Sequence, residues 1–405
     1  MIKHSTKTDC IPFSPIRKIF GQVTELRAQG KEVISLGIGE PDFDTPAHIS
    51  EAMFEATKKG ATHYTANKGI EELREAIIEK LKNDNDLDYN IEEIICTVGV
   101  GEGVYVALSA FLDPGDEVLV PDPSWLNYSH VPRLNDAVPV LYPLVSENNF
   151  QIDVKELEKR VTEKTKVLVV LDPSNPTGGV LRKEVLEEVA QFAIKHDLLV
   201  ISDEIYEKLI YDDNKHYSIA AVQGMRERTI VLNGFAKAYA MTGWRLGYIA
   251  APLELIPPMA KLHSYILANA TSMVQWGGVA ALKGTQEPVK AMVEEFENRR
   301  NFMVKAINYI KGLSCPNPGG AFYLFVDVKE TGMTGEEFSH YILHEAGVAL
   351  VPGTAFGERA IHEVRISYAT SMENLEKAVA WMKNAVEKHM AKRLVKEEFS
   401  ELKLS

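Results

Sequence analysis

Short apolar runs alternate with amphipathic segments through the middle of the chain. The runs are β-branched and apolar on both faces, as strands buried in a mostly parallel sheet are, and they lie at 93–98, 117–121, 166–172, 197–203 and 229–233. Between them, segments such as 182–196 place apolar residues three and four positions apart, the period of a helix with one buried face. This alternation predicts an open α/β sheet with helices on both sides and a ligand crevice at the carboxyl ends of its strands.

The pattern changes near residue 295, where a long, charge-rich helical stretch lies. It is followed by short strand-like segments between turn-forming residues, CPNPGGAFYLFVDV, VALVPG and EVRISY. Strands separated by such turns predict a smaller α+β domain. The charged tail, 387–405, is expected to extend the final helix.

The N-terminal segment is expected to associate with this smaller unit. It contains one helix, 15–29, and the loop LGIGEPDFDTP, which are too little for a third domain. We therefore predict a large α/β domain over residues 46–295 and a small domain made of residues 1–45 together with 296–405.

Composition and charge limit the partners. The chain has 405 residues, of which 45% are hydrophobic and 25% charged, and its net charge is −13. An acidic total without a long basic run argues against nucleic acid or an anionic membrane as the main partner. We find neither a secretion signal nor a membrane-length apolar segment. The three cysteines are scattered and form no disulfide or zinc pattern, so we expect a cytoplasmic protein.

Residues with chemical potential follow the predicted strands, at the edge where the crevice should lie. They occur in PDPSW (Trp125), DPSNPTGG (Asn175), SDEIY (Asp203 and Tyr206) and NGFAK (Lys237). Each residue alone fits a structural role, such as a helix cap for Asp203 or a surface loop for Lys237. However, Lys237 stands among Ala, Phe and Tyr, and burial there would shift its amine toward the neutral, nucleophilic form.

A glycine-rich segment, TVGVGEG, joins a predicted strand to a helix that begins near Val100. A helix start after glycines directs free backbone N–H groups at an anion. The spacing does not match the dinucleotide-binding fingerprint, and the chain has no Walker A sequence. Taken alone, the segment is equally compatible with a tight turn that binds nothing.

Together these segments resemble the class I aminotransferases, which depend on pyridoxal phosphate and have fold type I. GEPDFDTP, THYTANKG, DPGDEVLVPDPSW, SNPTGG, SDEIY, KAYAMTGWRLGY and VRISYATS occur in that family's order and spacing, over nearly the whole chain. The resemblance implies a large domain with a mostly parallel central sheet between helices, a smaller α+β domain and a homodimer. It also implies ping-pong transfer of the α-amino group of an aromatic, aspartate-like or broad range of L-amino acids to a 2-oxo acid, 2-oxoglutarate being expected.

The resemblance assigns roles around the cofactor ring. Lys237 would bind the cofactor aldehyde and later move a proton, for which a neutral amine is suited as nucleophile and base. Asp203 would pair with the pyridine nitrogen and keep it protonated. Tyr206 and Asn175 would reach the phenolic oxygen, and Trp125 would stack on the ring.

It also assigns the phosphate and the substrate contacts. The backbone of Gly101 and Glu102 and the side chain of Arg245 would bind the phosphate, together with Tyr64 of the neighbouring subunit, so the dimer would share its active sites. The α-carboxylate of the substrate would be held by Arg365, Asn175 and the backbone of Gly39. The planar guanidinium of Arg365 suits the geometry of a carboxylate.

Two departures from the family pattern concern specificity and phosphate binding. Ala236 and Gly234 stand where the family often has serines, and we look to the Thr271–Ser272 stretch for a replacement phosphate ligand. Gly101 stands where aspartate-specific relatives often carry lysine. Its lack of charge argues against strict dicarboxylate specificity and favours an aromatic or broad range.

Other functions remain to be weighed. A C–S β-lyase of the same fold would use nearly all the same residues, so motifs do not exclude it. A ligand-sensing domain of a transcription regulator is disfavoured, because the forty residues before the large domain lack a helix-turn-helix pattern. A protein that has lost its cofactor is disfavoured by the joint presence of the lysine, the aspartate, the tyrosine and both arginines.

Overall fold

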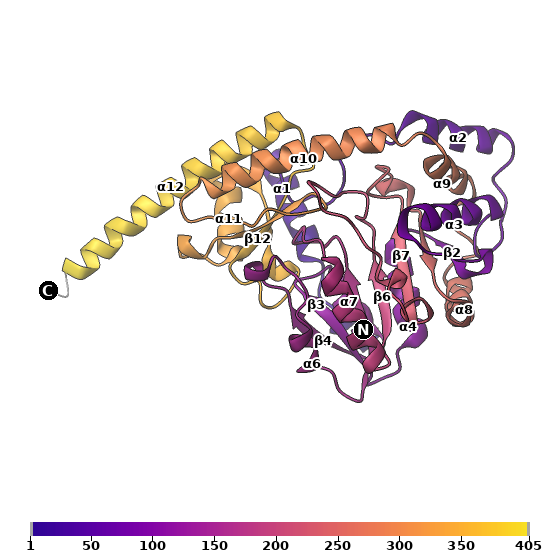
Figure 1. The fold of residues 1–405 in the computed structure, drawn as a ribbon. Coiled ribbons are helices and arrows are strands. Elements are labelled where there is room, and N and C mark those ends of the chain that lie inside the picture. The colour runs from indigo at the N-terminus through magenta and orange to yellow at the C-terminus, as the bar shows by residue number, and fades with distance from the viewer. Residues whose placement is uncertain (1–2, 403–405) are drawn as a thin grey trace.

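A seven-stranded sheet forms the centre of the larger part of the protein, and helices cover both of its faces (Figure 1). The computed structural model describes residues 3–402, with side chains through residue 393. In the order β2-β8-β7-β6-β5-β3-β4, every pair is parallel except those of β8, which runs antiparallel to both neighbours. The strands are β2 (Ile94–Thr97), β3 (Glu117–Asp122), β4 (Val138–Pro143), β5 (Thr165–Leu171), β6 (Leu199–Asp203), β7 (Thr229–Gly234) and β8 (Gly247–Ala250).

The helices around this sheet bury both faces of its strands. Along β5, Val167 and Val169 lie in one apolar cluster, whereas Leu168 and Val170 lie in another on the opposite face. Side chains of successive strand residues point to opposite faces, so a strand apolar at every position must be covered twice. The covering helices are α2 (Ala47–Lys58), α3 (Glu71–Asn85), α4 (Val100–Phe111), α5 (Asn127–Leu134), α6 (Val154–Glu158), α7 (Lys183–Lys195), α8 (Ile256–Ile266) and α9 (Ser272–Lys283).

The five predicted strands and the mostly parallel α/β sheet are confirmed, but two strands were missed. β4 contains Pro139 and Pro143, which are tolerated because β4 is an edge strand with one side free of ladder hydrogen bonds. β8 has only four residues, and its Gly247 lies opposite Gly234 of β7. The two glycines approach each other closely. A strand of four residues that begins with glycine is too short to give an apolar run that pattern analysis can find.

A smaller antiparallel sheet, in the order β11-β12-β9, lies beside three helices. Its apolar core includes Phe296 of the first helix, Phe338 of the second and Met382 of the third. The elements of this part are α10 (Glu287–Asn308), β9 (Tyr323–Asp327), α11 (Gly335–Ala346), β10 (Val348–Ala349), β11 (Val351–Pro352), β12 (Glu363–Ser367) and α12 (Met372–Leu402). The predicted extension of the final helix agrees with α12, and residues 403–405 lie outside the described residues.

The N-terminal segment lies against this smaller part. β1 (Ile34–Ser35) pairs in parallel with β10, and α1 (Pro15–Ala28) contributes Val23 and Leu26 to a cluster with Leu343 and Ala349. Helix α10 runs along the top of the molecule from one part to the other, so the predicted boundary at residues 295 and 296 falls inside one continuous helix (Figure 1). The exact domain limits therefore stay a prediction.

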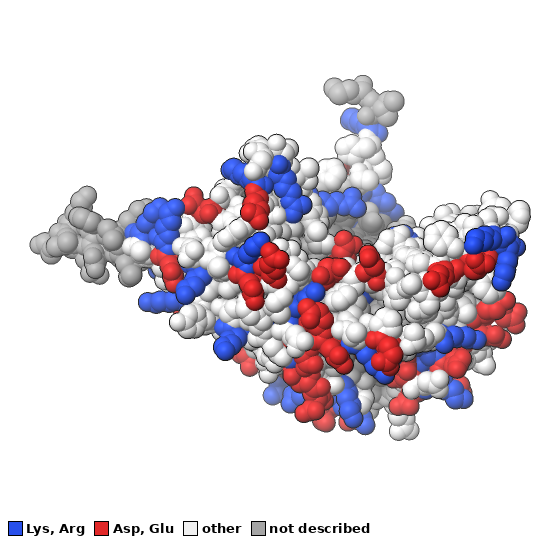
Figure 2. Space-filling model, turned by 90° about the horizontal axis from the view of Figure 1, so that it is seen from above, with Lys and Arg blue, Asp and Glu red and all other residues white. Residues whose placement is uncertain are grey.

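Charged side chains of both signs are interspersed over the face shown in Figure 2. Among residues 3–402, no helix has the length and apolarity that crossing a membrane requires.

Candidate active site

A cavity of about 370 Å³ opens where the carboxyl ends of the central strands meet the smaller sheet. Asp203 ends β6, and Lys237 follows β7, so the strand order places both at this edge. All but two of the residues predicted for the site line the cavity, namely Gly39, Gly101, Trp125, Asn175, Asp203, Tyr206, Lys237, Arg245 and Arg365. The exceptions are Glu102 and Tyr64.

Lys237 presents its amine to the cavity from an apolar surrounding. Its Nζ donates to the carbonyl oxygen of Gly39 at 2.5 Å and lies 5.6 and 5.7 Å from the rings of Tyr206 and Phe322. Burial, reinforced by the positive charge of Arg365, lowers the pKa of Lys237 to about 8. The neutral fraction of the amine near pH 7, the form that a nucleophile or base requires, is therefore far larger than that of an ordinary lysine.

Asp203 is a buried carboxylate with two internal donors. Its Oδ2 accepts a hydrogen bond from the Tyr128 hydroxyl at 2.8 Å, and its Oδ1 accepts one from the backbone N–H of Ile205 at 3.2 Å. Burial raises the pKa of Asp203 to about 6, although the bond from Tyr128 counteracts this effect. The carboxylate is thus fixed in direction and would gain from a cationic partner in the cavity. Sequence analysis missed Tyr128.

Arg365 is a buried guanidinium held from several sides. Its Nη1 donates to Oδ1 of Asn175 at 2.9 Å, and its Nη2 donates to the carbonyl oxygen of Gly37 at 2.7 Å. The rings of Tyr323 and Phe356 lie 4.5 and 4.6 Å from its central carbon. These contacts orient the guanidinium but supply no negative charge, which leaves it able to bind an anion.

Tyr206 and Asn175 follow the neighbouring strands β6 and β5. The Tyr206 hydroxyl is 2.8 Å from the Tyr323 hydroxyl, a partner that sequence analysis did not foresee. Burial raises the pKa of Tyr206 well above its ordinary value, so its hydroxyl stays protonated and can donate. Asn175 uses its oxygen toward Arg365, which leaves its amide N–H groups as donors.

The segment at the start of α4 forms a cradle made possible by glycine. Gly99 has φ of +74°, and a Cβ there would lie 2.7 Å from Nη2 of Arg245. A Cβ on Gly247 would lie 2.8 Å from the backbone of Gly99. Arg245 itself has φ of +57°, and its Nη1 donates to the carbonyl oxygen of Thr242 at 2.9 Å. A guanidinium and the free N–H groups of a helix start thus converge on one place, as in anion sites.

The side chain of Glu102 points away from the cavity. Its Oε2 accepts from the backbone N–H of Val98 at 2.6 Å, and its Oε1 lies 2.7 Å from Nδ1 of His263. His263 is fully buried, and its Nε2 lies 2.9 Å from the carbonyl oxygen of Asn67. Glu102 therefore braces the glycine turn with its side chain, and its place in the first turn of α4 leaves its backbone N–H free for the role that the resemblance implies.

Two predicted contributions to phosphate binding lie elsewhere in this chain. Tyr64 is 87% exposed and borders a separate cavity of about 510 Å³. The Ser272 hydroxyl donates to the carbonyl oxygen of His63, and neither Thr271 nor Ser272 lines the main cavity. The contact of Tyr64 with a neighbouring subunit stays a prediction.

The N-terminal segment supplies a cavity wall that sequence analysis missed. Ile16 and Phe20 of α1 and Ile38 after β1 line the cavity. The signal was present, because apolar residues on a short helix before the large domain need something to cover. Which cavity they would cover depends on the pairing of β1 with the distant β10, and pattern analysis cannot give that pairing.

These groups fit a ligand with a phosphate and a reactive carbonyl. The cavity holds the cations Lys237, Arg245 and Arg365, and none of them forms an ion pair within the part of the chain that the structure describes. Cations without carboxylate partners favour anionic ligands. Pyridoxal phosphate would suit this set: the Gly99 turn and Arg245 would hold its phosphate, Asp203 its ring nitrogen and Lys237 its aldehyde.

Fold and cavity together define an enzyme that depends on pyridoxal phosphate. Residues 31–381 match the family model of aminotransferases of class I and II. The chain belongs to this family. It is accordingly a transaminase, which moves amino groups between amino acids and 2-oxo acids.

Individual relatives cover nearly the whole chain. An aspartate aminotransferase of Pyrococcus abyssi (strain GE5 / Orsay) is 48% identical, over 94% of this chain and 98% of the relative. The aromatic-amino-acid aminotransferase 2 of Thermococcus litoralis is 45% identical, over 94% and 98%. Among solved structures, an aromatic aminotransferase from Pyrococcus horikoshii OT3 has a TM-score of 0.87 at 46% identity, covering 90% of this chain and 99% of that one. The aspartate aminotransferase from Thermus thermophilus with maleate has a TM-score of 0.90 at 40% identity, covering 95% and 100%.

The glycine turn can be tested with a matched pair of substitutions. In Gly99→Ala the new Cβ meets Arg245, whereas Gly115→Ala has a similar φ of +88° with nothing within 4 Å. Both should lose about 1–3 kcal/mol of unfolding free energy, because a positive φ strains alanine. Only Gly99→Ala should also raise the dissociation constant of pyridoxal phosphate, by about tenfold or more. Chemical denaturation and cofactor titration measure the two effects, and equal cofactor affinity in both variants would refute the cradle.

The pKa of Lys237 predicts how the apoenzyme takes up the cofactor. Its ordinary value of 10.5 is lowered to about 8. The neutral fraction, and with it the rate of covalent cofactor binding, should rise about tenfold per pH unit below pH 8 and level off above it. Stopped-flow absorbance checks this, with free Nα-acetyl-lysine as a control whose rate keeps rising past pH 9. A rate for the apoenzyme that also rises to pH 10 would contradict a lowered pKa.

Proposed function

We propose that this transaminase moves the α-amino group of an L-amino acid to 2-oxoglutarate by a ping-pong mechanism, in a homodimer. The observation that carries the proposal is the Lys237 amine of lowered pKa, which faces the same cavity as the buried Arg365. An amine base beside a carboxylate-binding guanidinium suits the removal of a proton from the α-carbon of an amino acid.

Each residue around the cavity has a distinct task in this proposal. When bound, pyridoxal phosphate supplies an electron-withdrawing ring joined to the substrate nitrogen. Asp203, held by Tyr128, keeps a proton on the ring nitrogen. Tyr206 and the amide of Asn175 donate to the phenolic oxygen. Lys237 would take the proton from the α-carbon and deliver it to the cofactor carbon C4′, on the other side of the substrate nitrogen.

The single cavity supports sequential use by donor and acceptor. It contains one lysine amine and one buried guanidinium from β12, so two α-carboxylates cannot be bound there at once. The amino donor must leave as a 2-oxo acid before the acceptor enters. The guanidinium of Arg365 binds the α-carboxylate of both, and the Lys237 amine serves both directions.

The lining of the cavity supports a range that includes aromatic donors. Ile16, Phe20 and Ile38 add apolar surface, and Gly101 leaves room because a Cβ there would meet only Trp125, at 3.8 Å. Apolar walls gain from burying a large side chain. The names of the relatives, aspartate and aromatic aminotransferases, support a range that includes both dicarboxylic and aromatic donors.

Exposed aromatic residues support the homodimer. Tyr64 and Tyr265 are 87% and 86% exposed, and Phe54 is 59% exposed. Large exposed apolar surfaces commonly mark an interface. In the proposed dimer, Tyr64 reaches the phosphate of the neighbouring site. The three cysteines are free, which supports a cytoplasmic location.

A single-turnover experiment tests the reaction. Holoenzyme mixed with an L-amino acid and no acceptor should release one equivalent of 2-oxo acid per site and then stop. The amino group then stays on the cofactor, because no acceptor is present to take it. Addition of 2-oxoglutarate should restart the reaction and yield glutamate. Repeated release of pyruvate and ammonia without acceptor would instead identify a C–S β-lyase and end this proposal.

The same experiment gains a catalytic control from two lysine variants. Lys237→Ala should lower kcat by more than about 10³-fold, because the general base is lost. It should also abolish the visible absorption of the lysine-linked cofactor. Lys68→Ala, which removes a lysine paired with Glu92 outside the cavity, should leave both unchanged.

Gly101 offers a test of donor range. Gly101→Lys should raise the ratio of kcat/KM for aspartate over phenylalanine by about tenfold to a hundredfold, because a charged hydrogen bond to the distal carboxylate becomes available. Gly101→Gln adds a similar bulk without the charge and serves as the matched control. If both variants change the ratio equally, space rather than charge at residue 101 sets the range.

A further inference from the structure

A second polar cluster lies next to the cavity and joins the ends of two neighbouring strands. Asp172 follows β5, Glu204 follows β6, and His216 comes from the segment before the short helical turn Ile219–Ala221. Nδ1 of His216 lies 3.0 Å from Oδ2 of Asp172, and Nε2 lies 3.2 Å from Oε2 of Glu204. The side chains are 7%, 2% and 0% exposed for His216, Asp172 and Glu204. None of the three was singled out from the sequence.

The remaining oxygens of both carboxylates are already engaged. Oδ1 of Asp172 accepts from the backbone N–H of Leu181 at 2.7 Å. Oε1 of Glu204 accepts from the hydroxyls of Ser202 and Ser218 at 2.9 and 2.6 Å. One oxygen of each carboxylate is left for the imidazole. The Nδ1 contact is a hydrogen bond, whereas Nε2 faces Glu204 at ion-pair distance without an aligned hydrogen bond. Two ring nitrogens that each face a buried carboxylate favour the doubly protonated imidazolium.

The charge balance agrees with this geometry. Burial alone would lower the pKa of His216, but its hydrogen bonds and charge contacts with Asp172 and Glu204 raise it to about 10. A positive ring between two buried carboxylates offsets part of their desolvation and their mutual repulsion.

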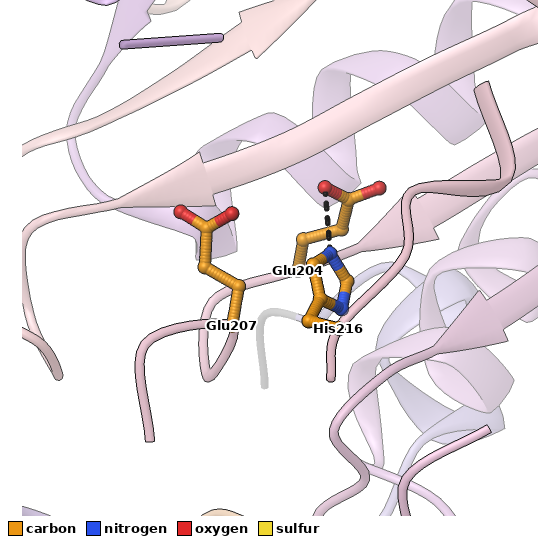
Figure 3. A group of neighbouring side chains, drawn as sticks. All are labelled: Glu204, Glu207 and His216. Carbon is orange, nitrogen blue, oxygen red and sulfur yellow. Dashed lines mark ion pairs between the residues drawn. The ribbon is translucent and has the colours of Figure 1, made fainter. Parts of the chain in front are cut away.

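A metal site is the competing explanation of the cluster. Glu204, Glu207 and His216 present ligand atoms within 4.8 Å of one another. However, the Glu207 carboxylate is paired with the ammonium of Lys80 and accepts from Asn85 at 2.7 Å. Figure 3 shows His216 joined to Glu204, with the Glu207 carboxylate to one side. An imidazolium and a lysine-bound carboxylate are not metal ligands, since a ligand must offer a free electron pair.

The cluster is connected to the cavity through the backbone. Asn175 lies three residues after Asp172, in a loop that the Asp172–Leu181 hydrogen bond closes. Asp203 immediately precedes Glu204, and its carbonyl oxygen accepts from the backbone N–H of Asp172 at 3.1 Å. The two cavity residues therefore sit on segments that this backbone bond joins and that His216 ties together through their side chains.

We propose that His216 is a positioning residue, which as an imidazolium between Asp172 and Glu204 fixes the relative placement of Asn175 and Asp203 in the cofactor cavity. The inference rests on the proposed function, in which Asn175 holds the phenolic oxygen and Asp203 the ring nitrogen. Loss of the imidazolium leaves two buried carboxylates facing each other, and one of them adjoins Asp203. Both loops would then move apart, and the cofactor would be bound less tightly.

The test compares His216→Gln with a matched control. His196 also faces a carboxylate, that of Glu158 at 3.1 Å, but it lies outside the cavity, so His196→Gln should behave as wild type. His216→Gln should raise the dissociation constant of pyridoxal phosphate about tenfold or more, as removal of one member of a buried ion pair does. It should lower kcat by a similar factor, with KM for the donor within about threefold, because Arg365 stands on another element. The rise in Tm that the cofactor produces should also shrink.

A merely structural role predicts a different result. It would lower the Tm of the apo and holo forms equally and leave the cofactor dissociation constant within twofold of wild type, which would overturn the inference. If His216→Gln does not fold, Glu204→Gln takes its place, because the amide keeps the shape and removes one charge, and the same outcomes decide. Zinc chloride provides a further arm: a rise in the Tm of the wild-type apoenzyme that is absent in His216→Gln would mean a metal site and would also overturn the inference.

Failure of the proposed function would look different. Asp203→Asn is measured beside the other variants. If it leaves cofactor binding unchanged, the assignment of the cavity itself is wrong. If Asp203→Asn weakens binding and His216→Gln does not, the cavity assignment stands and only the role of His216 falls.

Discussion

The structure depends on the placement of positive charge in a cavity with many apolar and aromatic lining residues. Lys237 and Arg365 are both held among aromatic and apolar groups, and neither has a carboxylate partner within the described residues. Removing cations from water without a counter-charge is costly, and the cost appears as a lowered pKa for Lys237. The same cost that makes the amine neutral and reactive also makes the cavity select anionic ligands. In the proposed function, one constraint thus supplies both the base and the binding energy.

The fold sustains this constraint through its topology. Parallel strands bring Asp203 and Lys237 to one edge of the central sheet, although they come from different strands. β12 of the smaller sheet brings Arg365 to the same place from more than a hundred residues further along the chain. The glycines around Gly99 let the backbone itself approach the ligand. Strands of both parts therefore place the charged groups: Arg365 lies on β12, Lys237 in the turn after β7 and Arg245 just before β8.

The division between the central sheet and the remote segments also separates what could be predicted from the sequence from what could not. Apolar runs in the sequence identify the buried strands, and the residues that follow these strands were found because strand ends meet at one edge of the sheet. Partners from remote segments could not be found this way. The bond from Tyr128 to Asp203, the brace between Glu102 and His263, and the wall formed by Ile16 all depend on packing between elements far apart in sequence. Pattern analysis gives the period of a helix, but it does not say what the helix faces.

This division also separates reaction chemistry from substrate choice. Asp203, Lys237 and the glycine turn belong to the central sheet, whereas Ile16 and Phe20 belong to α1, which lies before it in the chain. Gly101 is the point where the two sets meet, because it belongs to α4, the helix proposed to bind the phosphate, and yet leaves open space beside Trp125. Side chains on α1 can therefore change without moving the groups that handle the proton. Such independence lets one reaction serve amino acids of different size, and it explains why chain segments that fix the chemistry leave the preferred donor undetermined.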